Sequence, residues 1–415
     1  MRVARQGAEF FSFAAGKVQR SKRCAIFGAI LAIWAVCMFT PGQAFAVSWH
    51  SPHQAGILAG TSAAECFGYS LGITSDGATA VVGAPCANSY NGRAYVFWLN
   101  DDGQWVQTAE LTPPSSAATY GEFGSSVAIS RDGSTLAVVA DYVYAYTKQA
   151  DGDWALSATL GSEPFGLGAE LALSKNGSTL LVSEWMLNKD TGAAYIFTKK
   201  HGKWSQGATL TASDGVANDC FGLDGIALSE DGATAVIGSP HRNSDAGAAY
   251  VFANSGGTWK QTAELEVAGT GWLGTGAAIS GDGKTIALGS PYSFPPTSYV
   301  YTNSSGEWGQ PTQVTISDSV YGYADGHSLA LSKNGTVLAI GGLGRGEEIE
   351  GAVGMFVVDE SGTWQQQALL TVVPDLPLAG FGDPVAISDN GLTIIGGAMA
   401  ETNAFPSGAA IVFTD

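Results

Sequence analysis

A short turn sequence of the form Ser/Thr-x-Asp/Asn-Gly recurs seven times along this 415-residue chain. The glycines of the turns are Gly77, Gly133, Gly177, Gly232, Gly283, Gly335 and Gly391. Each turn joins two runs in which apolar residues alternate, as in SVAIS-RDG-STLAVV. Asp-Gly and Asn-Gly between such runs are strong signals for a β-hairpin, because the two-residue turns that they form require positive φ. Regular repetition of one hairpin predicts a repeat architecture.

A third run follows in every repeat, and a fourth run follows in six of them. The third run ends in an aromatic residue, as in 92–97 (GRAYVF), and a second tight turn then places a glycine two residues before a tryptophan that starts the fourth run. Four short strands per repeat are typical of a β-propeller blade. No segment has a sustained 3.6-residue period, so helix should be scarce. The sequence therefore predicts an all-β protein: a seven-bladed β-propeller of four-stranded antiparallel blades over residues 47–415.

The two ends of the chain predict how the ring closes. Seven copies of the first three runs are present, but only six are followed by a fourth run. The missing strand has a candidate near the other end, where Trp49 and residues 54–58 resemble the fourth-run pattern. We expect this mature N-terminal strand to pair into the last blade, because closure removes the exposed edges of an open array. The seven tryptophans, one per blade, are then expected to pack between neighbouring blades.

The N-terminal 46 residues have the pattern of a signal peptide. Basic residues between positions 17 and 23 precede an apolar run over 24–40, and Ala44-Phe45-Ala46 forms an A-x-A cleavage site. The alternative is an uncleaved signal anchor, because the apolar run is at the short limit of a membrane-spanning helix. We predict cleavage, no membrane insertion of the mature protein, and a secreted, periplasmic or cell-surface location.

The net charge of the chain excludes one class of partner. The formal net charge of −18 excludes nucleic acid as a favoured partner, because an acidic surface gains nothing from counterion release.

Three cysteines lie beyond the predicted cleavage site. Cys66 and Cys86 are equally distant in sequence from Asp76, so an antiparallel hairpin would place them opposite each other. They form a candidate disulfide, with the reduced pair as the alternative, and Cys220 is left free.

The repeats resemble FG-GAP repeats, the blades of integrin-α-type propellers and of many exported bacterial proteins. The FG motif corresponds to Phe67-Gly68, Phe123-Gly124, Phe221-Gly222 and Phe381-Gly382. The GAP motif corresponds to Gly83-Ala84-Pro85 and, as a near copy, Gly238-Ser239-Pro240. The resemblance covers residues 47–415, with a degenerate second blade. It implies a propeller used for extracellular recognition or cell adhesion, without catalysis by the propeller itself.

One feature of integrin-type blades does not carry over to this chain. Those blades often bind Ca²⁺ in the first hairpin through several oxygen ligands. In the first repeat, Gly72, Thr74 and Ala80 occupy the other ligand positions around Asp76. A single carboxylate cannot build the site, so we predict turn chemistry for the Asp or Asn, no metal ion in these hairpins and no cofactor.

The variable connections are the expected ligand-binding surface. In an antiparallel blade, the turns after strands one and three lie on one face, and the connections after strands two and four lie on the other. The first set is short and repetitive here, whereas the second varies and is free to carry recognition. Aromatic, arginine and histidine side chains there are typical binding anchors. The candidate set is Tyr90, Arg93, Trp185, His241, Arg242, Trp272, Tyr292, Phe294, Tyr323 and Arg345.

Our hypothesis from sequence is an exported, monomeric, non-enzymatic propeller that binds an extracellular protein or a glycan through this face. The alternatives are a polysaccharide-acting hydrolase or lyase that uses acidic residues near the central channel, and a passive surface scaffold. Residues 68–72 match G-x-S-x-G and residues 269–274 match G-x-G-x-x-G, but a predicted strand follows each match where the corresponding sites require a helix. No catalytic residue is therefore assigned.

Overall fold

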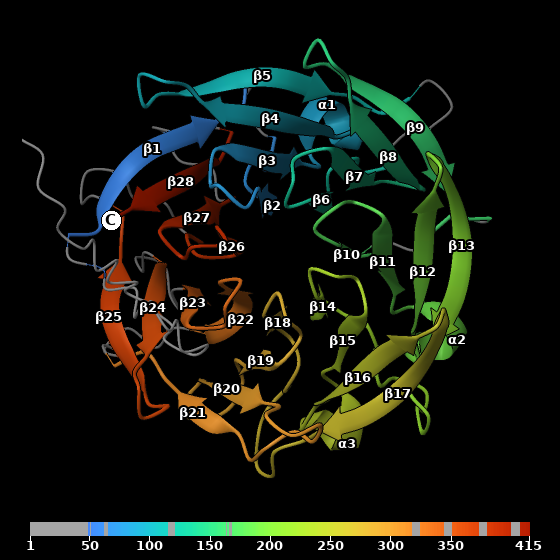
Figure 1. Cartoon of the computed structure of the whole chain (residues 1–415), viewed down its shortest axis with the longest axis vertical. Coiled ribbons are helices and arrows are strands. Elements are labelled where there is room, and N and C mark those ends of the chain that lie inside the picture. The colour runs from blue at the N-terminus through green and yellow to red at the C-terminus, as the bar shows by residue number, and fades with distance from the viewer. Residues whose placement is uncertain are drawn as a thin grey trace, which may run out of the picture. The chain divides into compact units, whose positions relative to one another are not determined.

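Seven four-stranded antiparallel sheets surround a central axis (Figure 1). The computed structural model describes residues 49, 51–61, 65–114, 121–162, 164–165, 168–317, 324–343, 351–372, 380–399 and 407–415. Helix in this part is limited to the four-residue elements α1 (Ala87–Tyr90), α2 (Leu187–Asp190) and α3 (Arg242–Asp245). The predicted all-β, seven-bladed propeller is confirmed. The predicted signal peptide lies outside the described residues, and no helix among those described is long and apolar enough to span a membrane.

The strands of each blade follow one another from the axis outward. Blades 1 and 2 contain β2 (Ser70–Ile73), β3 (Thr79–Ala84), β4 (Arg93–Leu99) and β5 (Trp105–Leu111), then β6 (Val127–Ile129), β7 (Thr135–Val139), β8 (Val143–Lys148) and β9 (Trp154–Leu160). Blades 3 and 4 contain β10 (Leu171–Leu173), β11 (Thr179–Glu184), β12 (Ala193–Lys200) and β13 (Lys203–Leu210), then β14 (Ile226–Leu228), β15 (Thr234–Ser239), β16 (Ala248–Ser255) and β17 (Thr258–Leu265).

The remaining three blades repeat this order. Blades 5 and 6 contain β18 (Ala277–Ile279), β19 (Thr285–Ser290), β20 (Thr297–Thr302) and β21 (Thr312–Val314), then β22 (Ala324–Leu331), β23 (Val337–Leu343), β24 (Ala352–Val358) and β25 (Trp364–Leu370). Blade 7 contains β26 (Val385–Ile387), β27 (Thr393–Ala398), β28 (Ala409–Thr414) and, as its outer strand, β1 (His53–Ala59).

The hydrophobic core lies between blades. Each of the seven core clusters combines side chains of two neighbouring blades; Tyr95 of β4, for example, shares a cluster with Ile395 of β27. The phenylalanines of the FG motifs are fully buried in these clusters. The seven repeat tryptophans belong to them as well, which confirms their predicted packing role. A single blade therefore has no core of its own.

Glycine in the FG motif is required by close approach of two blades. Gly68 has φ +95°, and a Cβ placed there would lie 2.4 Å from the carbonyl oxygen of Ala409 in blade 7. Such a contact is shorter than van der Waals packing allows, and positive φ adds strain for any other residue. The motif thus marks the point where neighbouring blades are in backbone contact.

The recurring turns use their Asp or Asn locally. In blade 1, Asp76 Oδ1 accepts hydrogen bonds from the Thr74 hydroxyl (2.6 Å) and the Ala78 amide (3.0 Å). The corresponding side chain makes the same backbone contact in each of the other six turns. This is the turn chemistry that the sequence predicts.

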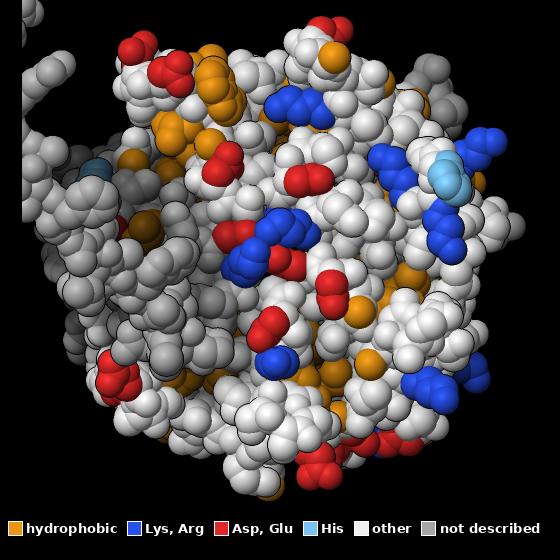
Figure 2. Space-filling view, in the orientation of Figure 1, with side chains coloured by type: hydrophobic (Ala, Val, Ile, Leu, Met, Phe, Trp, Pro, Cys, Tyr) orange, Lys and Arg blue, Asp and Glu red, His pale blue; other side chains and the backbone are white. Residues whose placement is uncertain are grey.

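A belt of hydrogen bonds joins these turns around the axis. The Ser75 amide donates to the Arg131 carbonyl, and the chain of contacts returns to Ser75 through the Asp389 amide. We call the second turn residues the central belt: Ser75, Arg131, Lys175, Glu230, Gly281, Lys333 and Asp389. Their side chains form ion pairs across the axis, including Lys333–Glu230 (3.3 Å) and Lys175–Glu230 (3.4 Å). Figure 2 shows acidic and basic side chains gathered at the centre of this face.

The N-terminal strand closes the ring as predicted. β1 pairs antiparallel with β28, with Leu58 opposite Ala410 and Gln54 opposite Phe413. The indole of Trp49 donates a hydrogen bond to the Gly391 carbonyl (2.9 Å), which ties the same segment to the last hairpin.

Cys66 and Cys86 form a disulfide with a Cα–Cα distance of 5.4 Å. The two residues lie just beyond the ends of β2 and β3, where the Cys86 amide donates a hydrogen bond to the Glu65 carbonyl (3.2 Å). Cys220 is buried as a free thiol, and burial raises its pKa to about 11. A thiol in this state is unreactive at neutral pH.

Removal of the closing strand is expected to destabilise the whole ring. Deletion of residues 49–59 exposes the edge of β28, so we expect a large loss in melting temperature and self-association, measured by calorimetry and size-exclusion chromatography. In the full mature protein, Leu58→Ala should cost about 2–5 kcal/mol because Leu58 is buried. Ile57→Ala, at a 36% exposed neighbour, is the matched control. Unchanged melting and a monomeric profile after the deletion would contradict closure.

The disulfide is expected to stabilise the first hairpin by restricting the unfolded chain. It spans 20 residues, for which loop-closure entropy predicts about 3 kcal/mol. Urea unfolding of the Cys66→Ser/Cys86→Ser variant should show this loss, and reductant should affect the wild type but not the variant. Cys220→Ser, which leaves the disulfide intact, is the control for sensitivity to reductant. Equal stability of the wild type with and without reductant would refute the prediction.

Candidate functional site

Three left-handed turns shape the variable-loop face. The elements α1, α2 and α3 each contain three consecutive residues with positive φ, as at Asn243, Ser244 and Asp245. This conformation costs roughly 1–2 kcal/mol per residue. Backbone hydrogen bonds to the next blade hold it: the Trp272 amide donates to the Asp245 carbonyl (2.8 Å), and equivalent bonds occur at α1 and α2. The turns therefore fix the loops of one blade against the entry segment of the next.

Three of the predicted residues meet at the boundary of blades 4 and 5. His241 precedes α3, Trp272 lies between β17 and β18, and Tyr292 lies between β19 and β20. The ring centroids are 4.5 Å apart for His241 and Trp272, and 4.2 Å apart for Trp272 and Tyr292. Tyr292 is 53% exposed, and Phe294, two residues further along the same connection, is fully exposed. We call His241, Trp272 and Tyr292 the aromatic cluster.

The aromatic cluster has defined supports. His241 Nδ1 lies 2.7 Å from Asp245 Oδ1, so the imidazole is oriented by its own turn. Trp272 has φ +59°, the conformation also found at Cys66, Glu122 and Cys220, which precede the FG phenylalanines of other blades. The unusual backbone at Trp272 is thus a property of the repeat.

Arg242, also predicted as a ligand anchor, is instead surrounded by carboxylates. It forms ion pairs with Asp214, Asp219 and Glu264, and only 15% of its side chain is exposed. The Tyr250 hydroxyl joins the same network through Asp214 (3.0 Å) and Glu264 (3.1 Å). The positive charge is neutralised within the blade, so Arg242 holds the loop that carries His241.

Arg93 has a similar role in blade 1. It pairs with Glu65 (3.1 Å) and Glu110 (3.2 Å), and Tyr95 donates a hydrogen bond to the buried Glu65 carboxylate. This network lies directly beside the disulfide, because Glu65 precedes Cys66 in the chain.

The other predicted residues lie elsewhere. Tyr90 is exposed in α1 of blade 1. Trp185 is half-buried in blade 3, and its indole nitrogen is buried without a hydrogen-bond partner among the described residues. Tyr323 and Arg345 lie outside the described residues.

A polar cavity at the centre of the ring was not predicted residue by residue. It has a volume of about 410 Å³ and is lined by the segments through which each blade enters its innermost strand. Its ionisable lining residues come from five different blades and are Tyr69, Glu170, Asp224, His327 and Asp383. Serines at 70, 125, 126 and 328 add hydroxyl groups, and apolar side chains such as Leu71 and Ile226 complete the wall. We call this the central cavity.

Two contacts organise the central cavity. His327 Nδ1 lies 2.9 Å from Asp383 Oδ2, which gives a histidine–carboxylate pair across blades 6 and 7. The Ser126 hydroxyl donates to Glu170 Oε2 (2.9 Å). Asp224 is exposed to the cavity and has no hydrogen bond or ion pair from its carboxylate within the described part of the chain.

The carboxyl groups of the central cavity differ in protonation. Burial, aided by the charges of Asp224 and Asp383, raises the pKa of Glu170 to about 8, so this group is largely neutral at pH 7. Burial also raises the pKa of Asp224, and the charge of His327 partly offsets this shift. For His327, burial acts to lower the pKa, but the hydrogen bond and charge of Asp383, together with the charge of Asp224, raise it to about 9. The imidazole is therefore cationic at pH 7.

Two adjacent positions in the aligned repeats carry the sequence signal that predicts this cavity. Tyr69, Asp224, His327 and Asp383 each stand five residues before the Ser or Thr of their turn, and Glu170 stands four before its own. Alignment of the repeats on their turns places these residues in adjacent columns at the start of the innermost strands. Comparing the FG and GAP motifs alone does not single out these columns.

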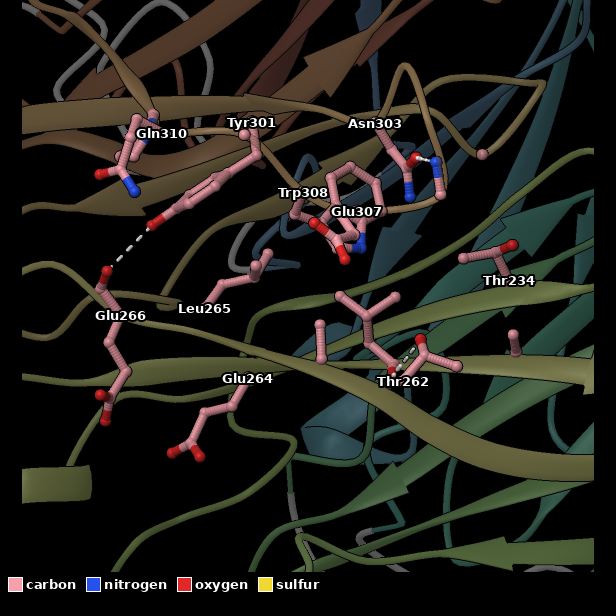
Figure 3. Close-up of a pocket in the computed structure, with 17 residues that line it drawn as sticks. Thr234, Thr262, Glu264, Leu265, Glu266, Tyr301, Asn303, Glu307, Trp308 and Gln310 are labelled. Atoms are coloured by element: carbon pink, nitrogen blue, oxygen red, sulfur yellow. Dashed lines mark hydrogen bonds between the residues drawn. The ribbon is translucent and has the colours of Figure 1, made fainter.

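A second hollow, of about 490 Å³, runs between blades 4 and 5 (Figure 3). It opens beside the three-residue outer strand β21, with Trp308 in its wall. The Tyr301 hydroxyl donates to the Glu266 carbonyl (3.3 Å), shown as a dashed line in Figure 3. Glu264 and Glu266 also line it, and they contact Arg242 and Asn243 respectively. This groove therefore adjoins the α3 loop, which carries His241 of the aromatic cluster.

Comparison with known proteins supports the fold. The FG-GAP repeat family model matches residues 204–252, which include Phe221-Gly222 and the GAP-like Gly238-Ser239-Pro240. A solved structure of Kuenenia stuttgartiensis hydrazine synthase is similar with a TM-score of 0.56 and 17% identity, over 85% of this chain and 96% of that chain. Pseudomonas aeruginosa periplasmic gluconolactonase, PpgL, has a TM-score of 0.50 and 16% identity, over 73% of this chain and 85% of that chain. At such identities these two similarities concern the fold alone.

The match covers the outer strand of blade 3 and the first three strands of blade 4. The other blades repeat the same turn and the tryptophan between blades, and blades 1, 2 and 7 also repeat the buried FG phenylalanine. The chain therefore folds as a seven-bladed β-propeller and contains a segment that matches the FG-GAP repeat family.

Proposed function

We propose that this protein is an exported recognition propeller that binds a glycan through its variable-loop face, with the aromatic cluster as the principal contact. The observation that carries this proposal is the convergence of His241, Trp272 and Tyr292 from three separate connections into one partly exposed surface. Aromatic rings offer large apolar faces with little conformational entropy to lose, and one polar edge for hydrogen bonds. These faces suit the C–H faces of sugar rings.

An extracellular location fits the covalent structure. The Cys66–Cys86 disulfide is of a kind that persists in oxidising compartments such as the periplasm or cell exterior. The proposal includes no catalytic step, a monomeric protein and no nucleic-acid partner. An extracellular protein ligand on the same surface is the alternative outcome of the binding test.

A polysaccharide hydrolase or lyase is the second candidate, and the central cavity favours it. Carboxyl groups whose surroundings separate their pKa values are the usual acid and base of such reactions, and here a neutral Glu170 lies near Asp224. Incubation of the purified protein with a panel of polysaccharides decides between the two functions. Cleavage that is lost in Asp224→Asn and retained in Tyr292→Ala would establish the enzyme, whereas binding without cleavage supports recognition.

Tyr292→Ala is expected to weaken glycan binding about tenfold or more, which corresponds to about 1.4 kcal/mol, because it removes the 53% exposed ring of the aromatic cluster. Binding is measured by calorimetry against the best ligand of a glycan array. Trp98→Ala is the matched control, since Trp98 is 44% exposed near the turn at the end of β4, on the opposite face. Unchanged affinity for Tyr292→Ala, or an equal loss for Trp98→Ala, would contradict the proposed surface.

A further inference from the structure

We infer that the central cavity is a second ligand site, which takes a single amino sugar unit carrying one protonated amine. This inference adds a second binding site to the proposed glycan recognition. It rests on the proposed function only in taking the larger ligand to be a glycan. The cavity itself is defined independently by its volume, its lining and the groups left without partners.

The shape of the central cavity suits one small molecule. Its volume of about 410 Å³ falls within the roughly 300–1,000 Å³ typical of small-molecule sites. The lining residues stand at the start of the innermost strands, where the chain arrives from the variable-loop face. At the other end of those strands, the central belt fills the axis with ion-paired side chains. A ligand therefore enters from the face that also carries the aromatic cluster.

The charge of the central cavity leaves one negative group unmatched. At pH 7 Glu170 is largely neutral, and the His327 cation is paired with Asp383 at 2.9 Å. Asp224 then remains as a carboxylate without a hydrogen bond or ion pair within the described part of the chain. A carboxylate in surroundings that raise its pKa binds a cation more strongly than one in bulk water, because screening is weaker there. The charge balance calls for a ligand with a single positive charge.

The uncharged groups of the cavity suit hydroxyls. Glu170 Oε2 accepts a hydrogen bond from Ser126, and the neutral carboxyl group is able to act as both donor and acceptor toward a ligand. Ser125 and Ser328 also line the cavity. Tyr69, which is 44% exposed, presents an aromatic ring for the apolar face of a pyranose. One protonated amine on a hydroxyl-rich ring satisfies all of these groups, and this defines the ligand class as an amino sugar.

The test compares three monosaccharides that differ at one position: glucosamine, glucose and N-acetylglucosamine. We expect calorimetry at pH 6 to show binding of glucosamine and about tenfold or weaker binding of the two uncharged sugars, because only the amine pairs with Asp224. Asp224→Asn should abolish this preference. Trp98→Ala, on the opposite face and outside the cavity, should leave glucosamine affinity within about twofold.

A stability measurement checks that Glu170 is neutral and that the variants fold. The pKa of Glu170 is raised from 4.5 to about 8 by burial and by Asp224 and Asp383, so the folded state holds a proton that the unfolded state releases. The wild type should therefore lose melting temperature relative to Glu170→Gln as pH rises from about 4.5 to about 8. A constant difference across this range would show that Glu170 is ionised in the folded protein.

Three outcomes overturn the inference: equal affinity for glucosamine and glucose, no binding of any of the sugars, or an unchanged preference in Asp224→Asn. The Tyr292→Ala variant separates this inference from the proposed function, since it lies outside the cavity and should bind glucosamine normally. Loss of binding to larger glycans in this variant, with retained glucosamine binding, supports both sites. Retained glucosamine binding in a protein that binds no larger glycan supports the cavity alone.

Discussion

Burial of apolar side chains between neighbouring blades is the constraint on which the structure depends. Every core cluster is shared by two sheets, so each blade is stable only while its neighbours are in place. The belt of turn hydrogen bonds and the left-handed loop turns act at the same boundaries, one on each face of the ring. The boundaries between blades are therefore fixed both by apolar packing and by backbone hydrogen bonds.

This arrangement explains where the candidate sites lie. The aromatic cluster takes His241 from blade 4 and Tyr292 from blade 5, and the central cavity takes its polar side chains from five blades. Groups distant in sequence are held at defined separations because the repeat fixes the backbone that carries them. The chain is thus free to vary side chains at the blade entrances and in the loops without changing the packing between blades.

The fold follows from local sequence, whereas the sites depend on details of the loops. The turns, the FG motif and the tryptophan of each repeat predict four strands per blade and the closing strand at Trp49, because these signals act within one hairpin or between adjacent blades. Loop composition places His241, Trp272 and Tyr292 on the same face of the ring, where the structure brings them together. It does not reveal that Arg93 and Arg242 are neutralised by carboxylates, since those partners come from other connections and, for Glu110, from the outer strand β5. Predicting the lining of the central cavity requires an alignment of all the repeats, because its ionisable side chains come from five blades.

Hydrogen–deuterium exchange of the mature protein, with and without its best glycan ligand, tests the central claim most directly. Recognition on the variable-loop face predicts protection in the connections that contain His241, Trp272 and Tyr292, with the hairpin turns of the central belt unchanged. Protection confined to those hairpin turns, or no protection by a ligand that binds, would contradict the account.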